Sequence, residues 1–317
     1  RYQRMAIWAD RHGINTIALG HTADDQAETV LMRLARRSGV NGLAGMPQRT
    51  LREGITWVRP LLAASREDLR VYLRGQHIDW IDDPSNEDMT FDRIKARKAL
   101  TLLADLGIDA TGLSVVAEQM REARAALDWQ TFLAAKDVAQ VNAGAVILSE
   151  RRLRLLPSEI RRRLLVHAVN WISGNTYPAR RAAVANLISA LRKGQGGTAD
   201  GVHARRVGGE IWVFRELNAV AGKEATPADL WDDRWRLVPK HHVNEVGSLT
   251  VRALGDEGLE QCPDWRKSGL PHVVLLSTPA IWRGNQVIAA PLAGLDQTWH
   301  AALDGGEETF FAALLSH

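Results

Sequence analysis

Apolar positions in the first hundred residues follow two spacings, short unbroken runs and helical repeats. The runs are typical of buried strands, and they cover Asn15–Leu19, Ile55–Val58 and His77–Ile81. Helical spacing fills residues 1–13 and resumes after Thr22 and after Ser65. Alternation of strands and helices predicts an α/β domain with a parallel sheet.

The two internal helix starts carry capping residues. Thr22 stands three positions before Asp25, and Ser65 stands three positions before Asp68. This is the spacing of a capping box with Asp in place of Glu. Gly39 follows the first of these helices and can supply a left-handed cap. Both segments are therefore predicted to begin as helices at a defined residue.

After Phe91 the pattern becomes mainly helical. Long helical repeats predict helices over 112–139, 157–173 and 178–193. Two shorter runs, 198–207 and 210–216, predict a hairpin that turns at Gly208-Gly209.

The end of the chain changes character again. Residues 218–230 are polar and Ala-rich, as in a linker, and short apolar runs then predict a small β-rich module. These runs are Leu249–Leu254, Val273–Leu276 and Gln286–Ala290. The predicted domains are 1–105, 106–217 (helical and basic) and 226–317.

Composition excludes several classes and adds one clue. Hydrophobic residues make up 45% and charged residues 24%, which are ordinary globular values. No run of about 18 apolar residues occurs, and the single Cys262 excludes an internal disulfide and a CxxC pair. Between Glu150 and Arg215, 13 Lys or Arg face four Asp or Glu. Such clusters suit a polyanion, although solvated helix faces give the same pattern.

The segment Gly20–Thr29 lies where a predicted strand leads into a helix. Ligands of open α/β sheets bind at the carboxyl ends of strands, and helix N-termini attract anions. This helix start nevertheless holds three carboxylates, Asp24, Asp25 and Glu28. They could hold Mg²⁺ beside a phosphate, or hold or deprotonate an amine. Stabilisation of the helix dipole explains them without any function.

Several motifs of this region occur together in a known family. The sequence GHTADDQAET resembles the HxxDDxxET signature of the tRNA(Ile)-lysidine synthases, N-type ATP pyrophosphatases of the PP-loop superfamily. Other segments resemble the family's GLAGM, RPLL and DPSN motifs, its basic helix and its Arg-Tyr pair. They are Gly42–Met46, Arg59–Leu62, Asp83–Asn86, Phe91–Arg97 and Arg1-Tyr2. Order and spacing agree over residues 1–105.

The resemblance implies a fold and an activity. The fold is the C-terminal part of a PP-loop (adenine nucleotide alpha hydrolase-like) parallel-sheet domain, then a mainly helical domain and a small β-rich module. Such enzymes use ATP to adenylate the wobble cytidine of an isoleucine tRNA with a CAU anticodon. The ε-amine of L-lysine then displaces AMP and gives lysidine. The resemblance also implies Mg²⁺, a cytoplasmic location, no membrane, and a homodimer.

The resemblance also implies roles for single residues. Asp24, Asp25 and Glu28 are the catalytic candidates, and Asp24 with Glu28 the candidate Mg²⁺ ligands. Arg1 is the candidate for ATP phosphates. The candidate substrate-binding residues are His21, Thr29, Arg33, Arg93 and Arg97. For each arginine a surface salt bridge is the alternative.

One expected motif is missing. The family's phosphate-binding SGGxDS loop occurs nowhere in these residues and would precede the first of them. We therefore expect an incomplete chain that lacks ATP pyrophosphatase activity on its own. Two alternatives stay open: a tRNA-thiolating PP-loop enzyme, which a single cysteine disfavours, and a non-catalytic tRNA-binding protein.

Overall fold

The computed structural model describes residues 2–81, 92–175, 179–240, 248–296 and 298–315. The chain forms two compact units, a first unit of residues 1–127 and a second unit of residues 128–316. The boundary falls inside the long helix α6 (Ala110–Val138). Each unit is described by itself. Among the described residues, no single helix is long and apolar enough to cross a membrane.

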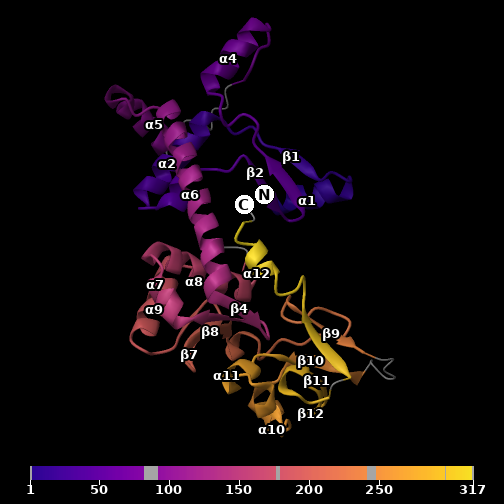
Figure 1. The fold of residues 1–317 in the computed structure, drawn as a ribbon. Helices are drawn as coiled ribbons and strands as arrows, with labels where there is room; N and C mark the ends of the chain where they lie inside the picture. Colours follow the sequence, from indigo (N-terminus) through magenta and orange to yellow (C-terminus); the bar gives the residue numbers. More distant parts are fainter. Residues whose placement is uncertain (1, 82–91, 176–178, 241–247, 297, 316–317) are drawn as a thin grey trace. The chain divides into compact units, whose positions relative to one another are not determined.

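The first unit contains one small sheet and the helices around it (Figure 1). Before α6 its elements are α1 (Tyr2–Arg11), β1 (Thr16–Ala18), α2 (Ala23–Ala35), α3 (Val40–Leu43), β2 (Arg49–Arg52), β3 (Ile55–Val58), α4 (Arg66–Gly75), α5 (Asp92–Leu103) and the 3-10 helix η2 (Ala104–Leu106). The strand order is β1-β3-β2, with β1 parallel to β3. The parallel pair confirms the first two predicted strands.

Strand β2 pairs antiparallel with β3 and was not predicted. The turn between them places Glu53 at φ 54° and Gly54 at φ 71°, so the chain reverses within two residues. Packing of α1 on β3 forms the core of this unit. Ala6 and Ala9 lie against Ile55 and Trp57, and the Trp57 side chain is almost fully buried. The apolar face of α1 therefore packs against this sheet.

The predicted third strand, His77–Ile81, is wrong. These described residues follow α4 and form no strand, and Ile81 is 95% exposed. Helix α4 has no buried residue among those described, and Figure 1 shows it projecting from the rest of its unit. An apolar run becomes a strand only where a neighbouring strand pairs with its backbone groups, and here no described strand does.

A five-stranded antiparallel sheet lies at the centre of the second unit. Its order is β4-β5-β8-β7-β6, from β4 (Ala139–Asn142), β5 (Ala145–Ser149), β6 (Gly197–Ala199), β7 (Val202–Val207) and β8 (Glu210–Arg215). The helices next to it in sequence are α7 (Glu150–Leu155), α8 (Ser158–Ser173) and α9 (Arg181–Arg192). The long helices α6, α8 and α9 agree with the three predicted ranges.

Two details of this sheet differ from the prediction. Strands β4 and β5 were not predicted within the helical region. The predicted strand 198–207 is divided into β6 and β7 by a turn at Asp200-Gly201, both of which have positive φ. The predicted hairpin turn at Gly208-Gly209 joins β7 to β8 and is confirmed.

The remaining elements form smaller sheets and short helices. They are the 3-10 helix η3 (Leu217–Ala219), β9 (Trp235–Pro239), β10 (Thr250–Ala253), α10 (Gly255–Glu260), η5 (Trp265–Ser268), α11 (His272–Leu275), β11 (Pro279–Arg283), β12 (Gln286–Ala289), η6 (Pro291–Ala293), β13 (Trp299–Leu303) and α12 (Thr309–Ala312). The sheets are β10-β11-β12 and β13-β9. The predicted strand Val273–Leu276 is wrong, because Pro271 caps the short helix α11 there. A short apolar run alone does not distinguish the two structures.

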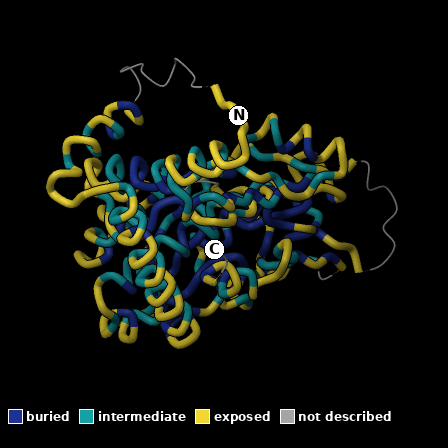
Figure 2. Tube along the Cα trace, turned by 90° about the horizontal axis from the view of Figure 1, so that it is seen from above, coloured by how far each residue is buried: buried dark blue, intermediate teal, exposed yellow. Residues whose placement is uncertain are grey.

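Both faces of the five-stranded sheet are covered within the second unit. On β5, Val146 and Leu148 belong to a core formed with α8 and α9, whereas Ala145 and Ile147 belong to a core formed with residues 254–293. Figure 2 colours the buried residues of the chain dark blue. The predicted domains 106–217 and 226–317 therefore pack on opposite faces of one sheet.

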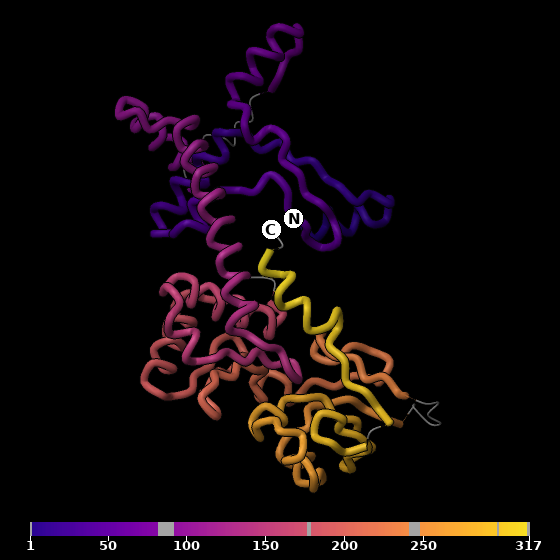
Figure 3. The backbone as a smooth tube through the Cα atoms, in the orientation of Figure 1, coloured from indigo at the N-terminus to yellow at the C-terminus, as the bar shows by residue number. Residues whose placement is uncertain are grey.

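The end of the second unit packs on the helical face of this sheet. Phe310 of α12 is fully buried in the same core as α8 and α9. His167 Nε2 lies 2.6 Å from the Phe310 carbonyl oxygen, and Trp171 Nε1 donates to Thr309 Oγ1 at 3.1 Å. Figure 3 traces the chain from β13 to this position.

Candidate active site

The carboxylates of α2 begin at the helix N-terminus, just beyond β1. The Asp25 carboxylate accepts hydrogen bonds from the Thr22 backbone N–H at 2.8 Å and from Thr22 Oγ1 at 2.9 Å. These bonds fix the start of the helix, as the capping spacing predicts. They also direct Asp25 Oδ2 toward the backbone and leave its other oxygen for a second partner.

Arg66, the first residue of α4, contacts all three carboxylates. Its backbone N–H donates to Asp24 Oδ2 at 2.7 Å. Its Nη2 donates to Asp25 Oδ1 at 2.9 Å and to Glu28 Oε1 at 3.1 Å. The start of α4 is thereby bound to the start of α2, which brings together segments about 40 residues apart.

Glu28 is the most buried of the three carboxylates. Its side chain is 1% exposed, and Arg97 Nε of α5 donates to its Oε1 at 3.0 Å. Within the described part of the chain, its Oε2 is buried without a hydrogen-bond partner. Because a buried charge is costly unless paired, Arg66 and Arg97 are what keep an ionised Glu28 stable here.

Charges around the site shift two pKa values in opposite directions. Burial raises the pKa of Asp25, but the Thr22 hydrogen bonds and the cations Arg66 and Arg93 outweigh it, so the pKa lies below its ordinary value. For Arg66, burial lowers the pKa, but the nearby Glu28, Asp25 and Asp24 raise it by more, so the net shift is upward. Both groups therefore stay charged at neutral pH.

His21 completes this cluster at the end of β1. Burial lowers its pKa, Asp25 opposes the shift, and the cations Arg59 and Arg93 add to it. Its Nδ1 is buried, and no described residue forms a hydrogen bond with it. A neutral imidazole with an unpaired nitrogen can accept or donate one proton to a bound molecule.

The structure thus brings six predicted site residues to one place, which are His21, Asp24, Asp25, Glu28, Arg93 and Arg97. Thr29 is buried, and its hydroxyl donates to the Asp25 backbone oxygen at 2.8 Å. Arg33 Nη1 donates to the carbonyl oxygens of Gly42 and Gly45, each at 2.8 Å. Thr29 and Arg33 therefore make contacts within the fold, and their roles toward substrate stay predictions. Arg1 and the segment Asp83–Asn86 lie outside the described residues.

Arg66 and Gln26 were missed at the level of sequence. Arg66 directly follows the predicted cap Ser65. The signal available in the sequence was therefore a cation at the first position of a predicted helix. Gln26 is buried, donates from Nε2 to the Met46 carbonyl at 3.0 Å, and accepts from the Met46 N–H at 2.7 Å. It fixes the Gly-rich loop against α2.

No cluster of three or more His, Cys, Asp or Glu that could bind a metal occurs among the described residues.

Cys262 is buried, and burial raises the pKa of its thiol. A buried thiol with a raised pKa is a poor nucleophile. The chemistry of the first unit therefore rests on carboxylates, guanidinium groups and one imidazole.

Comparison with known proteins assigns the class and then the family. Residues 1–103 match the family model described as a PP-loop domain, so the first unit belongs to the PP-loop class of ATP-using domains. A tRNA(Ile)-lysidine synthase of Ruegeria pomeroyi is 50% identical over 317 residues, which cover all of this chain and 75% of that relative.

Two more distant relatives carry the same name. One from Bradyrhizobium sp. is 36% identical over 215 residues, 65% of this chain and 60% of that protein. One from Wolbachia pipientis is 28% identical over 300 residues, 92% of this chain and 69% of that protein. The chain belongs to the tRNA(Ile)-lysidine synthase family, whose members are carbon–nitrogen ligases.

Proposed function

We propose that this protein joins L-lysine to the wobble cytidine of an isoleucine tRNA with a CAU anticodon, at the expense of ATP. The observation that supports this most is the convergence of Asp24, Asp25 and Glu28 on Arg66 at the strand end of the first unit. The names of the relatives point to the same reaction. AMP and diphosphate are the other products.

The carboxylates suit an amine substrate. The ε-amine of lysine is mostly protonated at neutral pH, with a reference pKa of about 10.4, and must lose a proton before it attacks. Asp25, whose pKa is lowered, is better suited to hold the ammonium than to accept its proton. The neutral imidazole of His21 can accept that proton. The lysine nitrogen then bonds to the activated cytidine carbon, and the bond from that carbon to AMP breaks.

The arginines suit the phosphate groups of the reaction. The side chains of Arg66 and Arg97 are 30% and 35% exposed, so each has a surface open to a ligand while it contacts Glu28. Arg93 is exposed on α5 beside them. Guanidinium groups match phosphate geometry, and we assign these three to ATP phosphates or to the tRNA backbone.

Mg²⁺ fits the residues present. Magnesium is usually bound by one or two carboxylates with substrate phosphates and water, so a three-residue protein cluster is not needed. Asp24 and Glu28 lie one turn apart on α2, and Glu28 Oε2 is a buried oxygen with no hydrogen-bond partner among the described residues. We assign these two as its ligands. When bound, Mg²⁺ would neutralise charge on the ATP phosphates.

A lysidine-forming assay tests this function. The complete gene product is mixed with unmodified isoleucine tRNA bearing a CAU anticodon, ATP, Mg²⁺ and labelled lysine. We expect label in the tRNA with the natural protein, and about a hundredfold less with Asp24→Asn or Asp25→Asn. Asp105→Asn, an exposed carboxyl of the same unit, is the matched control.

Two outcomes of this assay would decide against the proposal. Tight tRNA binding without label would leave a non-catalytic tRNA-binding protein. In a parallel reaction with a labelled sulfur donor in place of lysine, sulfur in the tRNA would indicate a thiolating enzyme. We further propose a cytoplasmic location, where tRNA and ATP occur together, and a homodimer, which sedimentation of the purified protein tests.

A further inference from the structure

A second site candidate lies within the second unit. It is a cavity of about 350 Å³ between α7, α8, α9 and the strands β7 and β8. Its floor is aliphatic and consists of Leu153, Leu165, Ile188, Leu191 and Ile211. Its rim carries Glu150, Arg154, Arg161, Arg192 and Arg206. We call this cavity the arginine-rimmed pocket.

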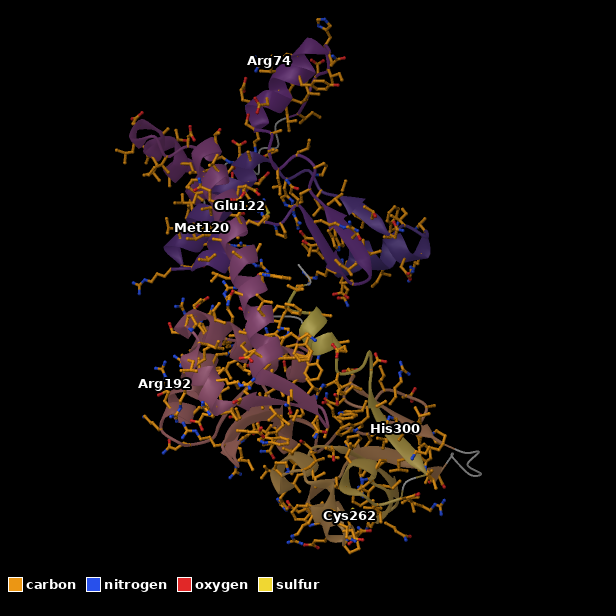
Figure 4. The ribbon with its side chains drawn as sticks, viewed as in Figure 1. Arg74, Met120, Glu122, Arg192, Cys262 and His300 are labelled. Carbon is orange, nitrogen blue, oxygen red and sulfur yellow. The ribbon has the colours of Figure 1, made fainter. Side chains whose placement is uncertain are left out.

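The rim has a net positive charge. Glu150 pairs with Arg154 and, at 2.8 Å, with Arg206. One carboxylate thus faces four guanidinium groups. Arg161 and Arg192 form no side-chain ion pair or hydrogen bond with any described residue, and Figure 4 shows Arg192 at the surface of α9. The rim can therefore bind an anion without first breaking a contact of its own.

Arg206 adds an unsatisfied donor. Its Nη2 contacts Glu150, but its Nε is buried and has no hydrogen-bond partner among the described residues. A buried donor without a partner is unfavourable. An acceptor oxygen on a molecule bound at the rim would remove that cost.

We propose that the arginine-rimmed pocket binds one unstacked nucleotide of an RNA strand, with its base on the aliphatic floor and its flanking phosphates on the arginines. Extruded bases are commonly held between apolar or aromatic side chains, and single-stranded nucleotides are what proteins read in this way. A volume of about 350 Å³ is within the range of small-ligand sites. This inference rests on the proposed function, which makes RNA the macromolecular substrate.

The pocket's shape separates this ligand from a duplex. In a duplex the bases are paired and stacked inside the helix, so none can enter a concave aliphatic site. The arginines would hold the phosphates, and an unstacked base would cover the apolar floor beneath them. A fatty carboxylate would also fill the floor, but it supplies one anionic group for a rim with three uncompensated positive charges.

The test measures binding of the complete protein to two fluorescent RNA probes. One is a single strand of about six nucleotides, and the other is the same sequence in a blunt duplex. Arg161→Ala and Arg192→Ala remove rim charges, and Ile188→Trp fills the floor without a change in charge. Arg151→Ala is the matched control, because Arg151 is exposed on α7 and does not line the pocket.

We expect the single strand to bind and the duplex to bind at least about tenfold more weakly at ionic strength near 0.15 M. Each of the three pocket variants weakens single-strand binding about tenfold, and Arg151→Ala changes it less than about twofold. The two rim variants also lower the salt slope of binding by about 0.7 each. Unchanged thermal unfolding shows that Ile188→Trp still folds.

Three results would overturn the inference. Equal binding of duplex and single strand would indicate recognition of the backbone alone. Equal losses in Arg151→Ala and the pocket variants would indicate diffuse charge. Displacement of the single strand by dodecanoate, with dodecanoate the tighter ligand, would indicate an apolar acid. Lysidine formation by the natural protein tests the proposed function separately. If label enters the tRNA but the pocket variants bind RNA like the natural protein, only the pocket inference is refuted. If the pocket variants lose RNA binding but no label enters the tRNA, only the proposed function is refuted.

Discussion

Glu28 shows how single residues define this site. Its side chain is almost inaccessible to water, and its neighbours are the guanidinium groups of Arg66 and Arg97. Removal of one partner of a buried ion pair is more costly than the pair itself is stabilising, since the other charge is left in an apolar surrounding. Stability and chemistry are therefore coupled at the same atoms.

Arg66→Ala tests this coupling. The variant removes the cation that contacts Asp25 and Glu28, and we expect the free energy of unfolding to fall by about 3 kcal/mol. Arg74→Ala is the control on the same helix, because the Arg74–Glu67 pair is exposed and contributes at most about 0.5 kcal/mol. Urea unfolding of both variants measures the difference, and equal losses would contradict the burial argument.

At the scale of elements, the Gly-rich loop 42–46 is held by contacts from α2. Gln26 binds the backbone of Met46 through both ends of its amide, and Arg33 binds two carbonyl oxygens of the loop. The two residues lie two turns apart on one helix, so one face of α2 determines the loop conformation. Loop and carboxylates are thus placed by the same element.

Gly45→Ala tests the fit of this loop. Gly45 has φ +65°, and a Cβ there would lie 2.6 Å from Gln26 Cδ. Gly54→Ala is the matched control, because φ is +71° with no atom within 4 Å of the added Cβ. We expect about 1 kcal/mol of backbone strain in Gly54→Ala, and about 1–3 kcal/mol more in Gly45→Ala. Thermal unfolding that gives equal losses would show that the Gln26 contact is unimportant.

The contact between α8 and α12 makes stability depend on pH. Burial lowers the pKa of His167 below its ordinary 6.5, although the Phe310 carbonyl and Asp128 oppose this. Below pH 6.5 the unfolded chain therefore binds a proton that the folded chain does not, so stability falls as pH falls toward the folded-state pKa.

His167→Gln removes the titrating imidazole, and its pH dependence is compared with that of the natural protein. Urea midpoints measured from pH 7.5 down to pH 5 should decrease more in the natural protein than in His167→Gln. His300→Gln, an exposed histidine of the same unit that Figure 4 labels, should follow the natural protein. A natural protein with the same pH slope as His167→Gln would show that this imidazole titrates alike in both states.

At the scale of the second unit, one sheet joins regions that are separate in sequence. The helical core contains Val146 and Leu148, and the second core contains Ile147, Trp212 and Trp282. Because alternate residues of one strand enter both cores, loss of either core exposes the sheet. Residues 128–225 and 226–316 are thus expected to unfold together.

Trp282→Ala tests this expectation. The side chain is 3% exposed, and its removal should lower the free energy of unfolding by about 3–5 kcal/mol. Hydrogen exchange should then accelerate equally in β5, β8 and β11. Trp129→Ala, at a residue 53% exposed, is the control and should change little. Faster exchange in β11 with β5 unaffected would indicate two separately folding domains.

The sequence by itself determined what depends on neighbours along the chain. The capping residues Thr22 and Ser65 begin helices where the spacing predicts, since each cap bonds to backbone only three positions away. The carboxylates at the start of α2 were predictable for the same reason. Strands β1 and β3 were predicted from their apolar runs, although they pair with each other 40 positions apart. Resemblance to a family supplied the reaction, which no spacing indicates.

Only the tertiary structure decided the contacts between distant segments. Arg66 and Gln26 became site residues because α4 and the Gly-rich loop pack on α2. The run His77–Ile81 stayed unpaired, and Val273–Leu276 became helical after Pro271. Apolar composition indicates that a segment can be buried, but which segment packs against it depends on the whole fold. The arginine-rimmed pocket likewise exists only where α7, α8, α9 and the sheet meet.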